Sequence, residues 1–194
     1  MERLYYLDVL LKYDHDIPCN FLLSKFMYAI HVTCALSVKL TGMSNIGVAF
    51  LDYDKEEARL GNKLRLFSFS EEVLKKIPQV KQFKNLEDYV LYGSVALVPE
   101  FVNEFVQYRR VQCKFNKEKL IRRYAKRHNE DLNFVRIRYK DLQSKNLSLP
   151  YVNLSSSTSG EHFRLYIDQI ENMEYIPPVF NSYGLISSGA LPKF

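Results

Sequence analysis

The sequence is poor in the features that mark disulfide-rich and metal-binding proteins. Its three cysteines, Cys19, Cys34 and Cys113, lie far apart and form no Cys-x-x-Cys pair, which argues against a disulfide framework and against a zinc knuckle. The four histidines also lack the spacing of metal ligands, so we expect no metal and no other cofactor. An odd, scattered set of cysteines fits a reducing compartment, and we expect a cytoplasmic protein.

Signals for membrane insertion and secretion are also scarce. No uninterrupted apolar run reaches the length of about 20 residues that crosses a bilayer. The first residues, Met1 to Leu11, carry charges and alternate in polarity, unlike the apolar centre of a secretory signal peptide. With 47% hydrophobic and 25% charged residues, the 194-residue chain has a globular composition, and we expect no membrane partner.

Positive charge is concentrated in one segment. The formal net charge is +5, yet the stretch from Lys114 to His128 holds seven Lys or Arg residues and a single acid, Glu118. The remainder of the chain is therefore slightly negative. Such a concentration favours a polyanionic partner, and nucleic acid before a membrane surface.

Hydrophobic periodicity in the first half alternates between strand and helix. Strands are expected over 5–11, 46–51, 64–69 and 92–98, with one helix opening at Pro18 and a second capped by Ser70. The resulting order β-α-β-β-α-β is that of a ferredoxin-like (RRM-like) unit. We therefore predict an α+β fold with a ferredoxin-like domain over residues 1–101.

The second half is predicted to form a smaller α+β domain, residues 102–194, around the basic segment. Strands are expected over 106–115, 147–154 and 162–170, and the basic helix follows the first of them. A hydroxyl-rich loop from Ser155 to Gly160 joins the last two strands.

The basic segment itself is predicted to be an amphipathic helix. Asn116 is a good N-cap, and Glu118 in the first turn suits the positive end of the helix dipole. At about 100° per residue, one face is basic and the opposite face is apolar. The basic face carries Lys119, Arg122, Arg123, Lys126 and Arg127, and the apolar face carries Leu120, Ile121, Tyr124 and Ala125. We favour nucleic-acid binding over an ordinary solvated helix, because such helices normally intersperse acids.

Two polar residues just upstream fit a base-reading role. Arg110 and Gln112 are two positions apart in the predicted strand, so we expect them on one face. Arginine can grip guanine O6 and N7, and glutamine can pair with adenine N6 and N7. The major groove of A-form RNA is deep and narrow, but it opens near helix ends. The pattern therefore favours a short RNA hairpin as the partner.

Three residues are candidates for RNA chemistry. His31 lies in the first helix, Ser156 in the hydroxyl-rich loop and Tyr183 near the end of the chain. Each alone is more often structural, yet together they supply what RNA cleavage needs. Histidine transfers protons near neutral pH, and serine can hold the 2′-hydroxyl that serves as nucleophile. The sequence does not show that these three side chains meet.

The motifs in order resemble a known family. The matching segments include Ile46-Gly47-Val48, Ala96-Leu97-Val98-Pro99, Arg110-Val111-Gln112 leading into the basic helix, Ser159-Gly160-Glu161-His162-Phe163-Arg164-Leu165 and Tyr183-Gly184-Leu185. They run through nearly the whole chain and are similar to the CRISPR-associated endoribonuclease of type I-F systems.

This resemblance implies a function and a set of site residues. It implies a metal-independent endoribonuclease that binds the repeat hairpin of precursor CRISPR RNA and cuts at the 3′ base of that hairpin. Cleavage would proceed by attack of a 2′-hydroxyl, leave a 2′,3′-cyclic phosphate, and keep the mature CRISPR RNA bound among the other subunits of the surveillance complex. The resemblance assigns catalysis to His31, Ser156 and Tyr183, stem reading to Arg110 and Gln112, stacking under the last base pair to Phe163, and RNA contacts to the basic face of the helix.

Some choices stay open at this level. Neighbouring hydroxyls of the serine-rich loop are alternatives to Ser156, Phe163 is also compatible with a core aromatic residue, and Lys126 stands where the resemblance leads us to expect arginine. A non-catalytic subunit that only binds the RNA hairpin is the alternative function. A DNA-binding regulator that places the helix in a B-form major groove is a more distant alternative.

Overall fold

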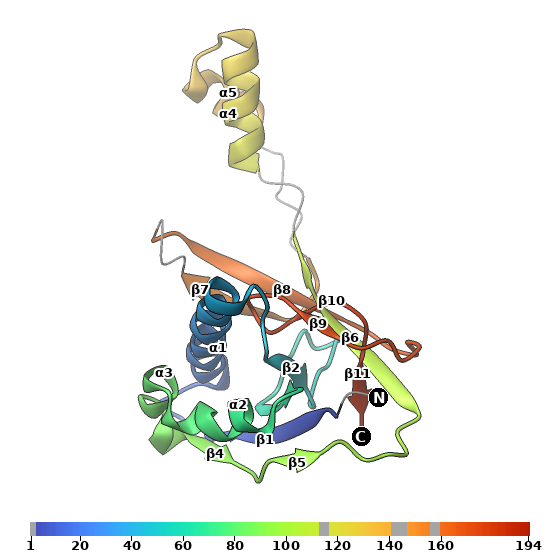
Figure 1. Cartoon of the computed structure of the whole chain (residues 1–194). Helices are drawn as coiled ribbons and strands as arrows, with labels where there is room; N and C mark the ends of the chain where they lie inside the picture. Colours follow the sequence, from blue (N-terminus) through green and yellow to red (C-terminus); the bar gives the residue numbers. More distant parts are fainter. Residues whose placement is uncertain (1–2, 113–116, 141–146, 156–159) are drawn as a thin grey trace. The chain divides into compact units, whose positions relative to one another are not determined.

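The computed structural model describes residues 3–112, 117–140, 147–155 and 160–194 (Figure 1). The chain forms two compact units, one made of Met1–Val111 with Leu149–Phe194 and the other of Gln112–Ser148. Helices combined with antiparallel sheets confirm the predicted α+β class. The smaller unit begins after Val111, whereas the sequence pattern placed a boundary between residues 101 and 102. The assignment of two domains at that boundary stays a prediction.

The larger unit contains a sheet in the order β2-β3-β1-β4, with β5 also paired to β1. Its strands are β1 (Tyr5–Leu11), β2 (Gly47–Phe50), β3 (Lys63–Ser68), β4 (Val90–Tyr92) and β5 (Ala96–Leu97), and all pairings are antiparallel. The elements up to β4 follow the predicted β-α-β-β-α-β order; the ferredoxin-like classification, which rests on this order, stays a prediction. The single strand predicted over 92–98 is wrong in extent, because Gly93 and Ser94, poor strand formers, separate β4 from β5.

Helix α1 (Cys19–Thr41) forms much of the core of the larger unit. Pro18 occupies the N-cap position, and Gly42 ends the helix with a left-handed conformation, φ 80°, donating its N–H to Val38 O. The helix contacts both β1 and β7 (Tyr151–Ser155), so it lies between the two larger sheets (Figure 1). The buried side chains of α1 are Leu22, Leu23, Phe26, Met27, Ala29, Ile30 and Cys34.

Judged by length and composition alone, α1 is long and apolar enough to cross a membrane, although charged and polar residues interrupt its apolar sequence. That criterion is weak evidence, because the core helix of a soluble protein meets it equally well. In this structure α1 packs one stripe of buried side chains into the core of the larger unit.

Shorter helices connect β3 to β4. They are α2 (Glu71–Lys76), η1 (Ile77–Gln79), α3 (Lys81–Lys84) and η2 (Glu87–Tyr89). Ser70 is the N-cap of α2, as predicted, but its side chain makes no capping hydrogen bond. Instead its backbone N–H donates to Ser68 Oγ at 3.1 Å. The rings of Phe83 in α3 and Phe26 in α1 pack edge to face, with centroids 5.3 Å apart.

A second antiparallel sheet of the larger unit has the order β11-β6-β8-β7. It consists of β6 (Glu104–Val111), β7, β8 (His162–Ile170) and β11 (Leu191–Lys193), while β9 (Val179–Phe180) pairs with β10 (Ile186–Ser188). Strand β8 matches the prediction. Strand β7 starts at Tyr151 rather than at 147, after Pro150, which has no N–H for a ladder. Strand β6 starts two residues before the predicted 106 and does not include Gln112, and residues 113–115 of the predicted strand lie outside the described residues.

The smaller unit is built from α4 (Lys117–His128) and α5 (Leu132–Arg138). Its own buried cluster consists of Ile121 and Ala125 from α4 and Val135 from α5. Asp131 caps α5 and accepts hydrogen bonds from the backbone N–H groups of Asn133 and Phe134. The predicted cap of α4, Asn116, lies outside the described residues.

Candidate functional site

His31 is half-buried on α1, one position after the fully buried Ile30. Its Nδ1 lies 2.7 Å from the backbone oxygen of Ser182, which is 151 positions away in sequence. A carbonyl oxygen only accepts hydrogen bonds, so Nδ1 must carry the proton of this contact. In the neutral imidazole, Nε2 is then the basic nitrogen.

Tyr183 covers the imidazole of His31. The two rings are stacked, with centroids 4.3 Å apart and planes 10° from parallel. Tyr183 belongs to a turn between β9 and β10 in which Asn181 Oδ1 accepts from the N–H of Tyr183 at 2.8 Å. The structure therefore brings together two of the three predicted catalytic residues from distant parts of the chain.

Phe163 and Arg110 extend this group from the second sheet. The ring of Phe163 on β8 meets Tyr183 edge to face, with centroids 6.5 Å apart. The exposed Arg110 on β6 holds its guanidinium carbon 5.2 Å from the centroid of Tyr183 and 5.8 Å from that of Phe163, within cation–π range. Phe163 is half-buried against the core, so it combines a packing role with a surface that faces the group.

Two of the other predicted site residues fall where the structure gives no description of the side chain. Ser156 lies outside the described residues, and so does the side chain of Lys119 on α4. Gln112 directly follows the last residue of β6 and is exposed, as Arg110 is, so the shared face of these two residues stays a prediction.

The basic face of α4 is exposed as predicted. Arg122, Arg123, Lys126 and Arg127 are all exposed, while Ile121 and Ala125 on the other side are buried against α5. Leu120 departs from the prediction, because it is 37% exposed. The seven-residue α5 covers the side of α4 that carries Ile121 and Ala125, and Leu120 lies beyond this contact.

Glu118 ties the two helices of the smaller unit together. It accepts a hydrogen bond from Arg136 on α5 and lies 3.5 Å from Arg122 Nε on its own helix. These arginines lower the pKa of the Glu118 carboxyl, with the hydrogen bond from Arg136 as the largest cause. Within the described residues, no acidic side chain pairs with Arg123, Lys126 or Arg127, so their charges face solvent.

Comparison with known proteins identifies the family. The family described as CRISPR-associated protein (Cas_Csy4) matches residues 6–194. The chain belongs to this family. A protein of Pseudomonas aeruginosa (strain UCBPP-PA14) named "CRISPR-associated endonuclease Cas6/Csy4" is 33% identical, over 98% of this chain and 99% of its own length. A protein of the same name from Escherichia coli (strain UTI89 / UPEC) is 28% identical, with the same coverage of both chains. The family expected from the motifs is thus confirmed, and the names of both relatives agree with a CRISPR-associated endonuclease.

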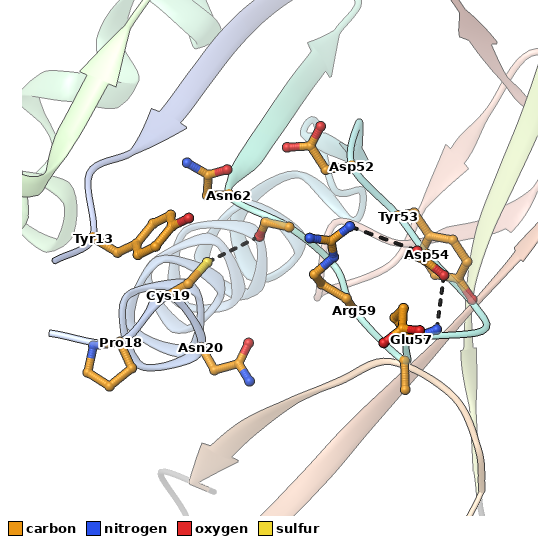
Figure 2. A pocket seen from close by; sticks show the side chains of 12 residues that line it. Tyr13, Pro18, Cys19, Asn20, Asp52, Tyr53, Asp54, Glu57, Arg59 and Asn62 are labelled. Atoms are coloured by element: carbon orange, nitrogen blue, oxygen red, sulfur yellow. Dashed lines mark hydrogen bonds and ion pairs between the residues drawn. The ribbon is translucent and has the colours of Figure 1, made fainter. Parts of the chain in front are cut away.

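In this member of the Cas_Csy4 family, one pocket of the larger unit is lined by none of the predicted site residues. The pocket in Figure 2 has a volume of about 800 Å³ and is lined by residues of the β2–β3 connection and of the start of α1. Its carboxylates, Asp52, Asp54 and Glu57, outnumber its one cation, Arg59, which lies 3.8 Å from Asp54. This acidic lining repels phosphate, so the pocket does not suit RNA.

Metal-ligating clusters were searched for in the described part of the chain. There, no group of three or more His, Cys, Asp or Glu side chains is arranged to hold a metal ion. The expectation that this Cas_Csy4 protein acts without a metal remains a prediction.

The sequence analysis did not identify two residues of the turn that contains Tyr183. Ser182 contributes a backbone oxygen, which no side-chain pattern reveals. Asn181 lies two positions before Tyr183. An asparagine is a signal for an Asx turn, because its side chain can bind the backbone N–H two residues further on. That signal locates a turn but does not locate its neighbour on α1.

Proposed function

We propose that this protein is a metal-independent endoribonuclease that binds the repeat hairpin of precursor CRISPR RNA and cleaves it at the 3′ base. The proposal rests on two contacts of His31, one with the ring of Tyr183 and one with the backbone oxygen of Ser182. Tyr183 fixes the plane of the imidazole, and the hydrogen bond to Ser182 O leaves Nε2 as the proton acceptor. A histidine prepared in this way is suited to general-base catalysis.

The reaction uses the nucleophile that RNA itself carries. His31 Nε2 takes the proton of the 2′-hydroxyl next to the scissile phosphate, and the 2′-oxygen forms a bond to phosphorus. The bond between phosphorus and the 5′-oxygen breaks, and the leaving oxygen takes a proton from water. Protonated His31 then gives its proton to the hydroxide that remains, so the neutral imidazole and water are restored. The products are a 2′,3′-cyclic phosphate and a 5′-hydroxyl. No metal ion takes part in this step, because neither an attacking water nor a covalent enzyme intermediate is needed.

Other residues hold the RNA in place. Ser156, or a neighbouring hydroxyl of the same loop, is proposed to orient the 2′-hydroxyl, which raises the rate by restricting its rotation. Phe163 is proposed to stack under the last base pair, and Arg110 and Gln112 to contact bases of the lower stem. On α4, the proposed RNA contacts are Lys119, Arg122, Arg123, Lys126 and Arg127. The exposed basic face of this helix supports this assignment.

After cleavage, we propose that the protein stays bound to the mature CRISPR RNA among the other subunits of the surveillance complex. Arginine contacts to phosphate are charge-assisted and favour slow release of the product. A subunit that binds the hairpin without cutting it has the same basic helix. The group around His31 favours the nuclease, because RNA binding alone does not require an oriented histidine.

The test compares the wild-type protein with His31→Ala on a repeat-hairpin RNA in EDTA. We expect the wild type to cut once and to leave a cyclic phosphate, and the variant to bind with nearly unchanged affinity but not to cut. Binding without cutting by the wild type supports the hairpin-binding subunit. Full cleavage by the variant removes His31 from the mechanism, and cleavage that depends on added magnesium removes the metal-independent chemistry.

A further inference from the structure

The side chain of Asn181 organises the turn that faces His31. Asn181 Oδ1 accepts hydrogen bonds from the backbone N–H of Tyr183 at 2.8 Å and from that of Leu185 at 3.2 Å. The backbone of Asn181 closes the same turn, because its N–H donates to Leu185 O and its oxygen accepts from Gly184 N–H. The Asn181 side chain is half-buried, so these bonds are partly shielded from water.

The same turn is fixed against the core. The backbone oxygen of Gly184 accepts from Val48 N–H on β2 at 2.8 Å. Gly184 has φ 72°, and a Cβ there would lie 2.8 Å from Val48 Cγ2 and 3.0 Å from Ile30 Cγ2. Ile30 directly precedes His31 on α1, so the turn sits against α1 beside the imidazole.

One peptide group links Asn181 to His31. The carbonyl of Ser182 and the N–H of Tyr183 belong to the same planar peptide unit and point in opposite directions. Asn181 Oδ1 binds the N–H end of this unit, and His31 Nδ1 binds the carbonyl end. The side chain of Asn181 therefore sets the direction in which the Ser182 carbonyl points.

We propose that Asn181 is a positioning residue that selects the reactive tautomer of His31 through this peptide group. This inference rests on the proposed function, in which neutral His31 needs a free Nε2. If the peptide unit rotated, the carbonyl would leave Nδ1 and the N–H of Tyr183 would turn toward it. Nδ1 would then accept a hydrogen bond, Nε2 would carry the proton, and His31 could not take a proton from the 2′-hydroxyl.

The experiment compares Asn181→Ala and Asn181→Ser with the wild type and with Asn153→Ala, an exposed asparagine on β7. Long-range ¹⁵N–¹H NMR, recorded where the imidazole is neutral, reports the tautomer of His31. The signals of His31 are assigned by their absence from the spectrum of His31→Ala. Single-turnover cleavage and hairpin affinity are measured on the same samples, and thermal melting verifies folding.

We expect the wild type and Asn153→Ala to hold the proton of His31 on Nδ1. Asn181→Ala should shift the proton toward Nε2 and cut about 10²-fold more slowly. Its hairpin affinity should stay within about twofold of the wild type, since Asn181 is not among the proposed RNA contacts. Asn181→Ser should restore part of the rate, because a hydroxyl caps such turns more weakly than an amide.

An unchanged tautomer and rate in folded Asn181→Ala overturn the inference, and so does a changed tautomer at an unchanged rate. If Asn181→Ala does not fold, the tautomer of His31 and the cleavage rate of Asn181→Ser test the inference instead. The NMR result does not depend on cleavage. A wild type with the expected tautomer that cuts no hairpin would therefore contradict the proposed function while leaving the tautomer selection by Asn181 in place.

Discussion

The aromatic ring of Tyr183 lies flat on the imidazole of His31, with centroids 4.3 Å apart and planes 10° from parallel. The stacked ring of Tyr183 restricts rotation of the imidazole about the bond that joins it to the histidine Cβ. The hydrogen bond from Nδ1 to Ser182 O fixes how the imidazole is turned within its own plane. The two contacts together leave the imidazole one orientation. We therefore predict that Tyr183 contributes to cleavage through its ring and not through its hydroxyl.

Two variants of Tyr183 separate the ring from the hydroxyl. Tyr183→Phe keeps the stack, so we expect single-turnover cleavage of the hairpin within a few-fold of the wild type. Tyr183→Ala removes the stack, and misplacement of a reacting group by about 1 Å costs on the order of 10²-fold in rate. A Phe variant as slow as the Ala variant would assign the role to the hydroxyl and contradict the orienting role of the ring.

Arg123 is predicted to dominate binding by the basic helix. Its guanidinium is exposed and has no acidic partner among the described residues, so it is free to form charge-assisted contacts with RNA. We expect Arg123→Ala to weaken hairpin binding far more than Lys84→Ala, which removes an exposed charge from α3. The comparison is made by titration at several salt concentrations, where each lost phosphate contact lowers the slope of log Kd against log salt by about 0.7 to 0.9. Equal losses in both variants would argue against docking through α4.

The packing of the smaller unit is also expected to control RNA affinity. Its buried cluster rests on Ile121, Ala125 and Val135, so little else compensates for a cavity there. Ile121→Ala typically costs about 2–5 kcal/mol, and Ile121→Val about 0.5–1.5 kcal/mol. We expect the Ala variant to lose hydrogen-exchange protection across α4 and to bind the hairpin weakly, while the Val variant stays close to wild type. Protection that persists in the Ala variant would show that α4 does not depend on this cluster.

The repetitive parts of the fold were predictable from the sequence. Apolar residues at helical spacing predicted α1, because one face of this helix meets the core, and the strand-like sequence over 162–170 predicted β8 with the bounds that the structure has. The short α5 was not predicted, since its seven residues include two arginines and expose Phe134 and Ile137. A helix of that length depends on its cap and on its contact with α4 rather than on a periodic pattern.

The candidate site was predictable only in part. The basic face of α4 follows from helical geometry, because all its members lie within one segment. The environment of His31 does not, since Ser182 is 151 positions away and contributes only a backbone atom. The resemblance to a family assigned roles to His31, Tyr183 and Phe163, and only the fold brings them together. Local patterns carry no information on contacts between such distant segments.

The last prediction concerns the nucleophile. If the 2′-oxygen of the RNA attacks the phosphate, one deoxy substitution at the nucleotide just before the cut should leave the hairpin bound but uncut. The contacts proposed for α4 and Arg110 with the stem do not involve that hydroxyl, so the Kd should stay within about twofold of that for the all-RNA hairpin. A deoxy substitution one nucleotide further from the cut serves as the matched control and should be cleaved at the normal rate. The uncut substrate is expected because His31 then has no proton to remove and no alternative nucleophile in reach. Cleavage of the deoxy substrate at an undiminished rate would show that water or a protein group attacks instead, and the role assigned to His31 Nε2 would then be wrong.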